Sequence, residues 1–355
     1  MTSKEFDAII VGGGVVGAAV FFRLASAGKS VLLIEKSRYG QGSSGWSGGI
    51  LRCFHPSALL ADMATEAFPE FRAVSRNGGP EFHQCGFLYF VYEGQEGLAH
   101  ERIRQLEGRT AIQWLNDEEA AQRFPAIVWD NLAGAVFEPE AGYMDPVAVS
   151  KYWIEGAEAH GQLALEGVEF NGIATDEQGL CGVHSSAGFL RTRCLILCPG
   201  AWSKKLAEKS GLSLPQSIKS KAIQLNTFAS DHVISNNHPA YIDPELELYG
   251  RGEKPDLVNV GSPVSSWDID PDQYTPLSMS HVLLTHELAK KRFKWASGAK
   301  AAGGRRRFDA YTEDEHGVIA ACPNAPGVYW ATGFSGGGFK LAPAIAKKIV
   351  ELTFS

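Results

Sequence analysis

The sequence has few cysteines, and neither they nor the histidines are arranged as in a disulfide framework or a metal site. The six cysteines are scattered at positions 53, 85, 181, 194, 198 and 322, with no Cys-x-x-Cys pair. The ten histidines include no His-Glu-x-x-His or similar ligand spacing. We therefore expect free thiols in a reducing compartment and no bound metal.

Basic charge and long apolar runs are also scarce. The 355 residues carry a formal net charge of -7, which disfavours nucleic acid as a partner because phosphate binding requires a basic surface. The one basic region, at 290–294 with 305–307, is more typical of a solvated helix face than of a binding patch. Glycines interrupt the apolar stretch at 8–22, so we expect no signal peptide and no membrane span. A cytoplasmic globular protein is the resulting expectation.

A glycine-rich turn between two apolar segments is the first positive signal. Residues 6–36 have the pattern of strand, turn, helix and strand, and the second strand ends on Glu35. Gly12 permits a tight turn, Gly14 lets backbone amides approach a pyrophosphate, and Gly17 lets the helix lie close to the strand. The helix N-terminus favours phosphate. Glu35 is placed to accept hydrogen bonds from a ribose diol and would repel a 2′-phosphate, so the unit predicts a site for a dinucleotide other than NADP.

Two kinds of sequence alternate along the rest of the chain. Compact strand-and-helix segments are separated by a stretch at 216–304 that is richer in Pro, Asp, Asn and His. That stretch predicts antiparallel strands and loops covering a pocket. Elsewhere the pattern predicts helices at 57–76, 146–160 and 341–352, and strands at 87–92, 167–170, 195–198 and 328–333.

Three further blocks accompany the glycine-rich unit. They are the loop Gly-Ser-Ser-Gly-Trp-Ser-Gly-Gly-Ile-Leu-Arg at 42–52, the turn Cys-Pro-Gly-Ala-Trp-Ser at 198–203, and Ala-Thr-Gly-Phe-Ser-Gly-Gly-Gly-Phe-Lys at 331–340. In this order, the four blocks resemble the FAD-dependent D-amino-acid oxidase superfamily, and most closely its sarcosine-oxidase-like branch, which also contains glycine oxidases.

The resemblance implies an α/β fold. A Rossmann-like FAD-binding domain would comprise residues 1–80, 143–215 and 305–355. An interleaved antiparallel-sheet α+β substrate (cap) domain would comprise 81–142 and 216–304.

The resemblance also implies which residues bind the cofactor. The loop at 333–338 would face the flavin N1/C2=O edge, where charge accumulates on reduction, and Val168 would hold adenine through its backbone. The implied FAD-binding residues are Gly12, Gly14, Val15, Val16, Gly17, Glu35, Lys36, Gly42, Ser43, Ser44, Gly48, Gly49, Val168, Cys198, Gly200, Trp202, Gly333, Ser335, Gly336, Gly337, Gly338, Phe339 and Lys340.

Arg52 and Lys340 close the first and the last of these loops. In sarcosine-oxidase-like enzymes, an Arg and a Lys at these positions bind the substrate carboxylate, the Arg in a bidentate manner and the Lys as a point charge. Such a pair would orient the α-carbon over the flavin. The alternative is that both are ordinary surface cations.

Several positions depart from the family pattern. Arg307 and Gly45 stand where relatives carry a Cys or a His that anchors the flavin, so we expect FAD to be bound non-covalently. Asn259 replaces a lysine thought to promote the reaction of reduced flavin with oxygen, so reoxidation by oxygen should be slow. Asp309 and Pro263 stand in place of pocket aromatics, which indicates a substrate other than sarcosine.

The leading hypothesis is an FAD-dependent oxidoreductase that oxidises a C–N bond of an amino acid or amine bearing a carboxylate, by hydride transfer to the flavin. An alternative is a flavoprotein that modifies a residue of a protein or peptide partner, for example during maturation of that partner's cofactor. A nicotinamide-linked dehydrogenase is disfavoured because it does not need the loop at 333–340. A flavin-binding protein without activity would require the space above the ring to be blocked.

Overall fold

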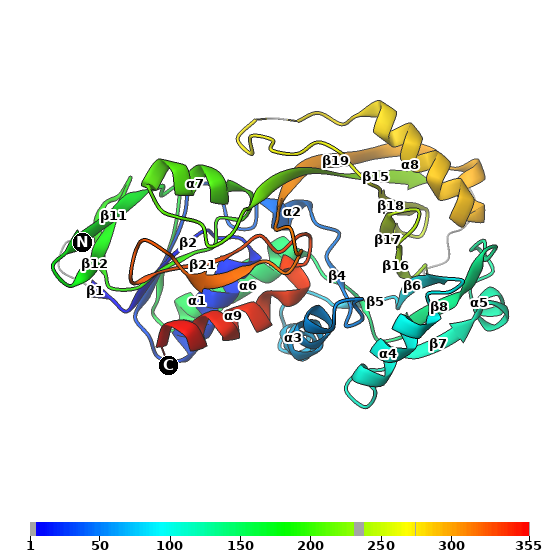
Figure 1. Cartoon of the computed structure of the whole chain (residues 1–355), viewed down its shortest axis with the longest axis horizontal. Coiled ribbons are helices and arrows are strands. Elements are labelled where there is room, and N and C mark those ends of the chain that lie inside the picture. The colour runs from blue at the N-terminus through cyan, green and yellow to red at the C-terminus, as the bar shows by residue number, and fades with distance from the viewer. Residues whose placement is uncertain (1–4, 231–237, 274, 355) are drawn as a thin grey trace.

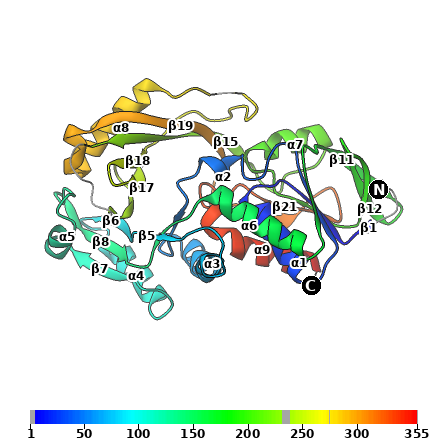
Figure 2. The same cartoon turned by 180° about the vertical axis from the view of Figure 1, so that it is seen from behind.

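The computed structural model describes residues 5–230, 238–273 and 275–354. Within these ranges the strands form a six-, an eight-, a four- and a three-stranded sheet. Figure 1 shows two halves joined by the long strands β15 and β19, and Figure 2 shows the same arrangement from behind.

The six-stranded sheet confirms the Rossmann-like architecture. Its order is β10-β3-β2-β14-β21-β20, and all neighbouring pairs are parallel except β20 with β21. The strands are β2 (Ala8–Val11), β3 (Val31–Glu35), β10 (Leu163–Glu166), β14 (Leu195–Leu197), β20 (Val318–Ala321) and β21 (Val328–Thr332). The central strands are continuous apolar runs because both faces of a parallel sheet are covered.

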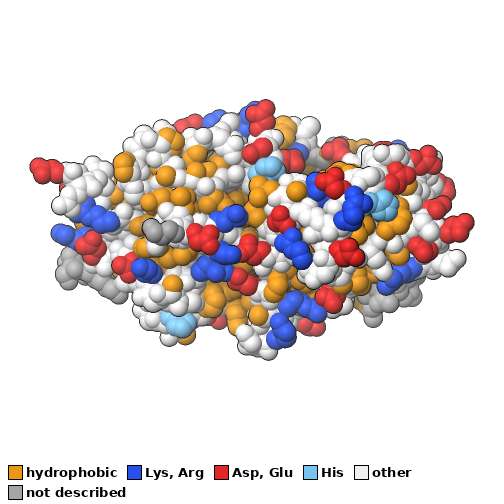
Figure 3. All heavy atoms as spheres, turned by 60° about the horizontal axis from the view of Figure 1, so that its bottom comes forward, with side chains coloured by type: hydrophobic (Ala, Val, Ile, Leu, Met, Phe, Trp, Pro, Cys, Tyr) orange, Lys and Arg blue, Asp and Glu red, His pale blue; other side chains and the backbone are white. Residues whose placement is uncertain are grey.

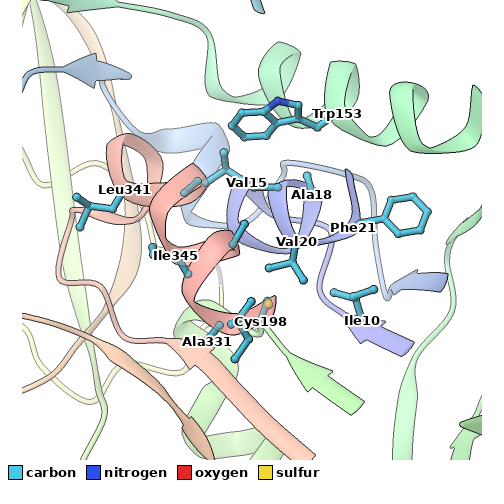
Figure 4. Packing of buried hydrophobic residues seen from close by; sticks show 14 of the residues in the cluster. Ile10, Val15, Ala18, Val20, Phe21, Trp153, Cys198, Ala331, Leu341 and Ile345 are labelled. Carbon is cyan, nitrogen blue, oxygen red and sulfur yellow. The ribbon is translucent and has the colours of Figure 1, made fainter. Parts of the chain in front are cut away.

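One face of this sheet packs against helices. The helices are α1 (Val15–Ser26), α3 (Ala58–Arg76), α6 (Pro146–Ala159) and α9 (Gly338–Phe354). Figure 4 shows Ile10 of β2, Val15 of α1, Trp153 of α6 and Ile345 of α9 in one buried cluster. Asp145 caps α6 by accepting hydrogen bonds from the amides of residues 147 and 148, as expected for an acid before an N-terminal proline.

The opposite face packs against a second layer. This layer contains the four-stranded sheet and the short helix α7, whose apolar side chains share a core with the six-stranded sheet, and the short helix η1, which precedes α7. The elements are β1 (Glu5–Phe6), β11 (Phe170–Asp176), β12 (Gly179–Ser185), β13 (Gly188–Thr192), η1 (Gly200–Trp202) and α7 (Ser203–Ser210).

The eight-stranded sheet forms the other half of the molecule. Its order is β19-β15-β18-β17-β16-β6-β8-β7, and only β6 with β16 is a parallel pair. The strands are β6 (Phe87–Tyr92), β7 (Gln113–Asn116), β8 (Leu132–Glu138), β15 (Lys219–Ala229), β16 (Ala240–Asp243), β17 (Leu248–Lys254), β18 (Leu257–Gly261) and β19 (Lys300–Tyr311). The sheet therefore joins both predicted insertions, and the domain boundary that we place at 304/305 falls within β19.

Smaller elements connect the halves and cover the large sheet. The three-stranded sheet has the order β4-β9-β5 and lies between the halves. The remaining elements are α2 (Ser43–Trp46), β4 (Ile50–Leu51), β5 (His83–Gln84), α4 (Glu96–Leu106), α5 (Asp117–Arg123), β9 (Gly142–Tyr143), α8 (Met279–Arg292) and η2 (Lys294–Gly298).

Two expectations from the sequence are wrong in part. Of the strand predicted at 167–170, only Phe170 belongs to a strand, β11, and residues 167–169 link β10 to β11, because Gly167 adopts a positive φ of 71° and ends the extended run. The basic region is only in part a solvated helix face: Lys291 on α8 is exposed and Lys290 pairs with Glu287 (2.7 Å) at the surface, whereas other residues of the region differ. Arg292 is buried in an ion pair with Asp243 (2.7 Å), and residues 305–307 belong to strand β19.

The surface carries charges of both signs. On the face in Figure 3, Lys and Arg side chains are interspersed with Asp and Glu, and apolar side chains lie between them. None of the helices in the described ranges is both long and apolar enough to cross a bilayer. All six cysteines are free thiols.

Candidate functional site

A cavity of about 540 Å³ lies at the carboxyl ends of β2, β3, β14 and β21, where open α/β sheets bind their ligands. The predicted FAD-binding residues that line it are Gly12, Gly14, Val15, Val16, Glu35, Lys36, Gly42, Ser43, Ser44, Val168, Cys198, Gly200, Trp202, Gly333, Gly336, Gly338 and Phe339. Those that are not part of its lining are Gly17, Gly48, Gly49, Ser335, Gly337 and Lys340.

The glycine-rich turn is packed so closely that two of its glycines leave no room for a side chain. A Cβ on Gly17 would lie 1.9 Å from the carbonyl oxygen of Gly12. Gly12 itself has φ of 107°, and a Cβ there would lie 2.4 Å from the carbonyl oxygen of Cys198. Gly17 thus acts by bringing α1 against the strand, and the N-terminus of α1 meets the cavity at Gly14 and Val15. This cradle fits a pyrophosphate.

The end of β3 provides the ribose and adenine side of the cavity. Glu35 accepts hydrogen bonds from the amides of Gly13 (2.7 Å) and Ser37 (2.8 Å), one on each carboxylate oxygen. Each oxygen keeps a lone pair for a ribose hydroxyl. The amide of Val168 donates to the carbonyl of Glu35 (2.9 Å), so only the carbonyl of Val168 remains for the adenine contact that we infer.

The loops at 42–52 and 331–340 meet at the opposite side of the cavity. Ser44 Oγ accepts a hydrogen bond from the amide of Val15 (3.0 Å), and Ser43 Oγ donates to the carbonyl of Phe308 (2.9 Å). In the last loop, the amide of Ser335 donates to the carbonyl of Ala310 (2.9 Å). The loop then enters α9 directly, so its amides and the helix N-terminus are placed to stabilise negative charge on a flavin ring.

A short acidic segment of the cap half, which contains Asp270 and Asp272, reaches the cavity. Asp272 lines the cavity and contacts Lys36 Nζ (2.9 Å), Trp202 Nε1 (2.7 Å) and Lys205. Lys205 also pairs with Asp270 (3.2 Å). These hydrogen bonds lower the pKa of Asp272 against the effect of its partial burial. The segment lies more than 60 residues from its nearest partner in sequence, and no local pattern indicated it.

Asp272→Asn is expected to speed FAD dissociation about 3- to 10-fold at low salt. The variant disrupts a network of ion pairs at the cavity, and such a network stabilises a structure more than a single exposed pair does. The difference from wild type should shrink at high ionic strength. Flavin fluorescence after dilution measures the release. Asp176→Asn, which breaks the exposed pair with Arg193, is the control. Equal release rates in all three proteins would show that the segment does not retain the cofactor.

Alternation along the strands makes the face of the eight-stranded sheet toward the cavity polar. Directly paired positions such as Arg251 and Asn259 share one face. The opposite face carries Tyr241, Val258 and Val260, which pack against α8. Alternate residues of the same strands thus point to opposite faces of the sheet, one that packs in the core against α8 and one that faces the cavity.

Two arginines of the polar face hold the first loop. Arg251 Nε donates to the carbonyl of Gly48 (2.7 Å), and its guanidinium lies 3.7 Å from the ring centre of Tyr143. Arg305 donates to the carbonyls of Trp46 (3.1 Å) and Ser47 (2.9 Å). The loop is therefore positioned from the cap side, an arrangement that no local sequence pattern indicates.

Asn259 faces the same side but is already engaged. Its Oδ1 accepts a hydrogen bond from Thr227 (2.8 Å), and its Nδ2 donates to Glu253. Glu253 in turn pairs with Arg251 (2.8 Å). Asn259 is not part of the cavity lining.

Arg52 is not a surface cation. Its side chain is 6% exposed, lies 4.9 Å from the ring centre of Phe87 and donates to the carbonyl of Phe54. Burial lowers its pKa to about 10, partly offset by Glu138, so it remains charged at neutral pH.

Lys340 lies in the first turn of α9, within electrostatic reach of Arg52. Burial and the charge of Arg52 lower the pKa of Lys340 to about 7, and Asp309 opposes this shift. The two predicted cations thus lie within range of an electrostatic interaction with each other. An anion placed between them would relieve their repulsion.

Two titratable residues at this place were not assigned a role from the sequence. His55 is buried, and within the described chain its Nε2 has no hydrogen-bond partner. Burial, Arg52 and Lys340 hold its pKa well below the usual value, so the imidazole is neutral. Asp309 lines the cavity and is charge-coupled to Lys340. For His55, the one signal in the sequence is its position three residues after Arg52.

Comparison with known proteins agrees with this geometry. Residues 7–352 match the family DAO, described as "FAD dependent oxidoreductase". The chain belongs to this family. The cavity, its glycine cradle and Glu35 fit the FAD that defines the family.

Individual relatives are distant. 4-Methylaminobutanoate oxidase (formaldehyde-forming) from Paenarthrobacter nicotinovorans is 23% identical over 98% of this chain and 43% of its own length. Peroxisomal sarcosine oxidase from Mus musculus is 25% identical over 98% of this chain and 92% of its own. The chain spans less than half the length of the first curated relatives that it matches.

Solved structures share the fold. L-Proline dehydrogenase from P. horikoshii superposes with a TM-score of 0.89 at 21% identity, covering 99% of this chain and 94% of that one. Glycine oxidase from Geobacillus kaustophilus gives 0.80 at 20% identity, covering 99% and 95%. Both confirm the predicted fold class.

FAD is expected to leave the protein on acid or heat precipitation. Arg307 stands at the position of the anchoring cysteine and lies 4.0 Å from the ring centre of Trp46. At the position of the anchoring histidine, a Cβ on Gly45 would lie 2.7 Å from the carbonyl oxygen of Gly40. Yellow colour retained in the washed pellet, or FMN in the supernatant, would contradict this expectation.

Proposed function

We propose that the protein oxidises the C–N bond of a small amino acid or amine that carries a carboxylate. The observation that carries the proposal is that two cations at the ends of the first and last loops, the buried Arg52 and Lys340, lie within range of an electrostatic interaction with each other. A carboxylate is the complement of such a pair. The names of the relatives, which refer to sarcosine, glycine, L-proline and 4-methylaminobutanoate, support this class of substrate.

In this proposal, bound FAD supplies the two-electron acceptor, held by the residues that line the cavity. Arg52 and Lys340 fix the carboxylate and thereby the α-carbon, so that orientation provides most of the rate enhancement. Arg251 and Arg305 keep the first loop in place from the cap side. Water then hydrolyses the resulting imine to a carbonyl compound and an amine.

A flavoprotein acting on a protein partner is the weaker candidate. It requires an open groove above the flavin loops, whereas the polar sheet face approaches the first loop to hydrogen-bonding distance at Gly48. The relatives' names refer to small molecules.

The deciding experiment is anaerobic reduction of the purified holoprotein. The panel contains glycine, sarcosine, N,N-dimethylglycine, L-proline and 4-methylaminobutanoate, each compared with the corresponding amine that lacks a carboxylate. Bleaching of the flavin by at least one carboxylate-bearing amine supports the proposal. Bleaching only by amines without a carboxylate, or by none of the panel, would contradict it.

A further inference from the structure

Asp309 places a carboxyl group in a site that otherwise presents cations. It lies on β19, faces the cavity side of the eight-stranded sheet and lines the cavity. One carboxylate oxygen accepts a hydrogen bond from the amide of Ala310 (2.8 Å), and the other accepts one from the amide of Gly336 (3.0 Å) in the last loop. Asp309 therefore sits at the junction of the cap sheet and the flavin loop.

The groups around Asp309 leave its charge only partly compensated. Burial raises the pKa of Asp309, whereas the two amide hydrogen bonds and the charge of Lys340 on α9 favour the ionised form. Tyr249 on β17 and Tyr311 on β19 are charge-coupled to it, and both phenols stay protonated at neutral pH.

Lys221 is the cross-strand neighbour of Asp309 on β15. Its ammonium lies over the rings of Trp267 (4.7 Å) and Tyr311 (5.2 Å). Because the amides of Ala310 and Gly336 each use one oxygen of Asp309, each oxygen retains a lone pair for a ligand.

A carboxyl group here would repel a ligand that carried only a carboxylate. With the cations Arg52 and Lys340 and the carboxyl group of Asp309 in one site, the charges match a zwitterion, which carries both a carboxylate and an ammonium group. We propose that Asp309 binds the substrate's ammonium group and accepts its proton, so that the site selects amino acids whose amine arrives protonated. This inference rests on the proposed function.

The proton transfer makes the amine competent for oxidation. One N–H bond of the ammonium breaks and an O–H bond forms on Asp309, which leaves a neutral amine with a free lone pair. The α-hydrogen then leaves with its bonding electron pair, as a hydride taken up by FAD, the oxidant of the proposed reaction, and the nitrogen lone pair turns the C–N bond into a C=N bond. Asp309 is returned to its ionised form when it releases the proton to water.

Asp309→Asn tests this role. The amide oxygen of asparagine can still accept the hydrogen bond from Gly336, so the contact to the flavin loop is retained, while the charge and the hydrogen bond from the neighbouring amide of Ala310 are lost. Asp314→Asn is the matched control, because Asp314 lies close by in sequence, is exposed and accepts hydrogen bonds from Thr312 (2.8 Å) and His316 (3.1 Å).

The test compares each amine with an isostere in which oxygen replaces nitrogen, for example L-proline with tetrahydro-2-furoate and sarcosine with methoxyacetate. Binding to the holoprotein is measured by calorimetry and by the flavin spectrum. Wild type and D314N should prefer the amine of at least one pair. D309N should lose about 30-fold or more of that preference, while its affinity for the oxygen isostere stays equal or rises.

The pH dependence gives a second readout. Because Asp309 must be ionised to accept a proton, flavin reduction in the wild type should decline as pH falls through its pKa, and D309N should lose this limb. An unchanged amine preference in D309N, or an equal loss of both ligands, would overturn the proposal for Asp309. If carboxylates and amines bind as described but no amine bleaches the flavin, the proposed function fails and the assignment of the ammonium site stands.

Discussion

Replacing Lys340 by methionine is expected to weaken the binding of a small carboxylate to the holoprotein about 30- to 1,000-fold. Loss of a charge-assisted hydrogen bond to a buried carboxylate costs about 2–4 kcal/mol. FAD content should stay nearly unchanged, because Lys340 is not part of the cavity lining. Titration with acetate or methoxyacetate, followed by the flavin spectrum, measures the effect. Lys347→Met, on the same helix and paired with Glu66 at the surface, is the control.

The pH dependence of this binding follows from the lowered pKa of Lys340, about 7. Below that pH the ammonium is charged, and the carboxylate affinity should not fall. Above it, binding must first take up a proton, so affinity should fall by about tenfold per pH unit. Arg52 stays charged throughout, with its pKa at about 10. Lys340→Met should abolish the fall above pH 7.

A carboxylate affinity that is independent of pH and unaltered in Lys340→Met would remove Lys340 from the site. Arg52→Ala is a less clean test. Arg52 also donates to Phe54 within the core and interacts with the buried Glu138, so its removal leaves a buried carboxyl without its nearest charge.

The cofactor side of the molecule could be predicted because its signals are local. The turn at Gly12, the strand end at Glu35 and the entry into α9 each depend on residues only a few positions apart. Within the turn, steric exclusion between Gly17 and the carbonyl of Gly12 leaves little freedom in how it folds. The predicted blocks therefore line one cavity.

The cap side could not be predicted to the same depth because its contacts are long-range. The hydrogen bond between Arg251 and Gly48 joins residues that are 203 positions apart, and the contact between Lys36 and Asp272 joins residues 236 positions apart. No spacing in the sequence encodes such pairings. Asp309 was noted from the sequence only as a departure from an aromatic pattern. Its meaning depends on the amide of Gly336 and the charge of Lys340, both of which come from a different part of the chain.

Reoxidation of the reduced flavin by oxygen is expected to be slow, and Asn259→Lys should accelerate it. We propose this from the position of Asn259, on the sheet face toward the flavin loops. The first electron transfer creates superoxide, and a preorganised cation beside it can be worth on the order of 100-fold in rate. Stopped-flow mixing of reduced holoprotein with oxygenated buffer measures the rate.

The structure refines the expected size of this acceleration. A lysine at 259 would lose the hydrogen bond from Thr227 and would meet the carboxylate of Glu253, which now accepts from Asn259 and pairs with Arg251. Part of the new charge would be neutralised, so the double variant Asn259→Lys/Glu253→Gln should react faster than the single one, with Glu253→Gln alone as the control. A wild-type rate as high as that of the double variant would contradict the proposal. It would indicate that an existing cation already stabilises superoxide. Arg251, which pairs directly with Asn259 between β17 and β18, is the candidate.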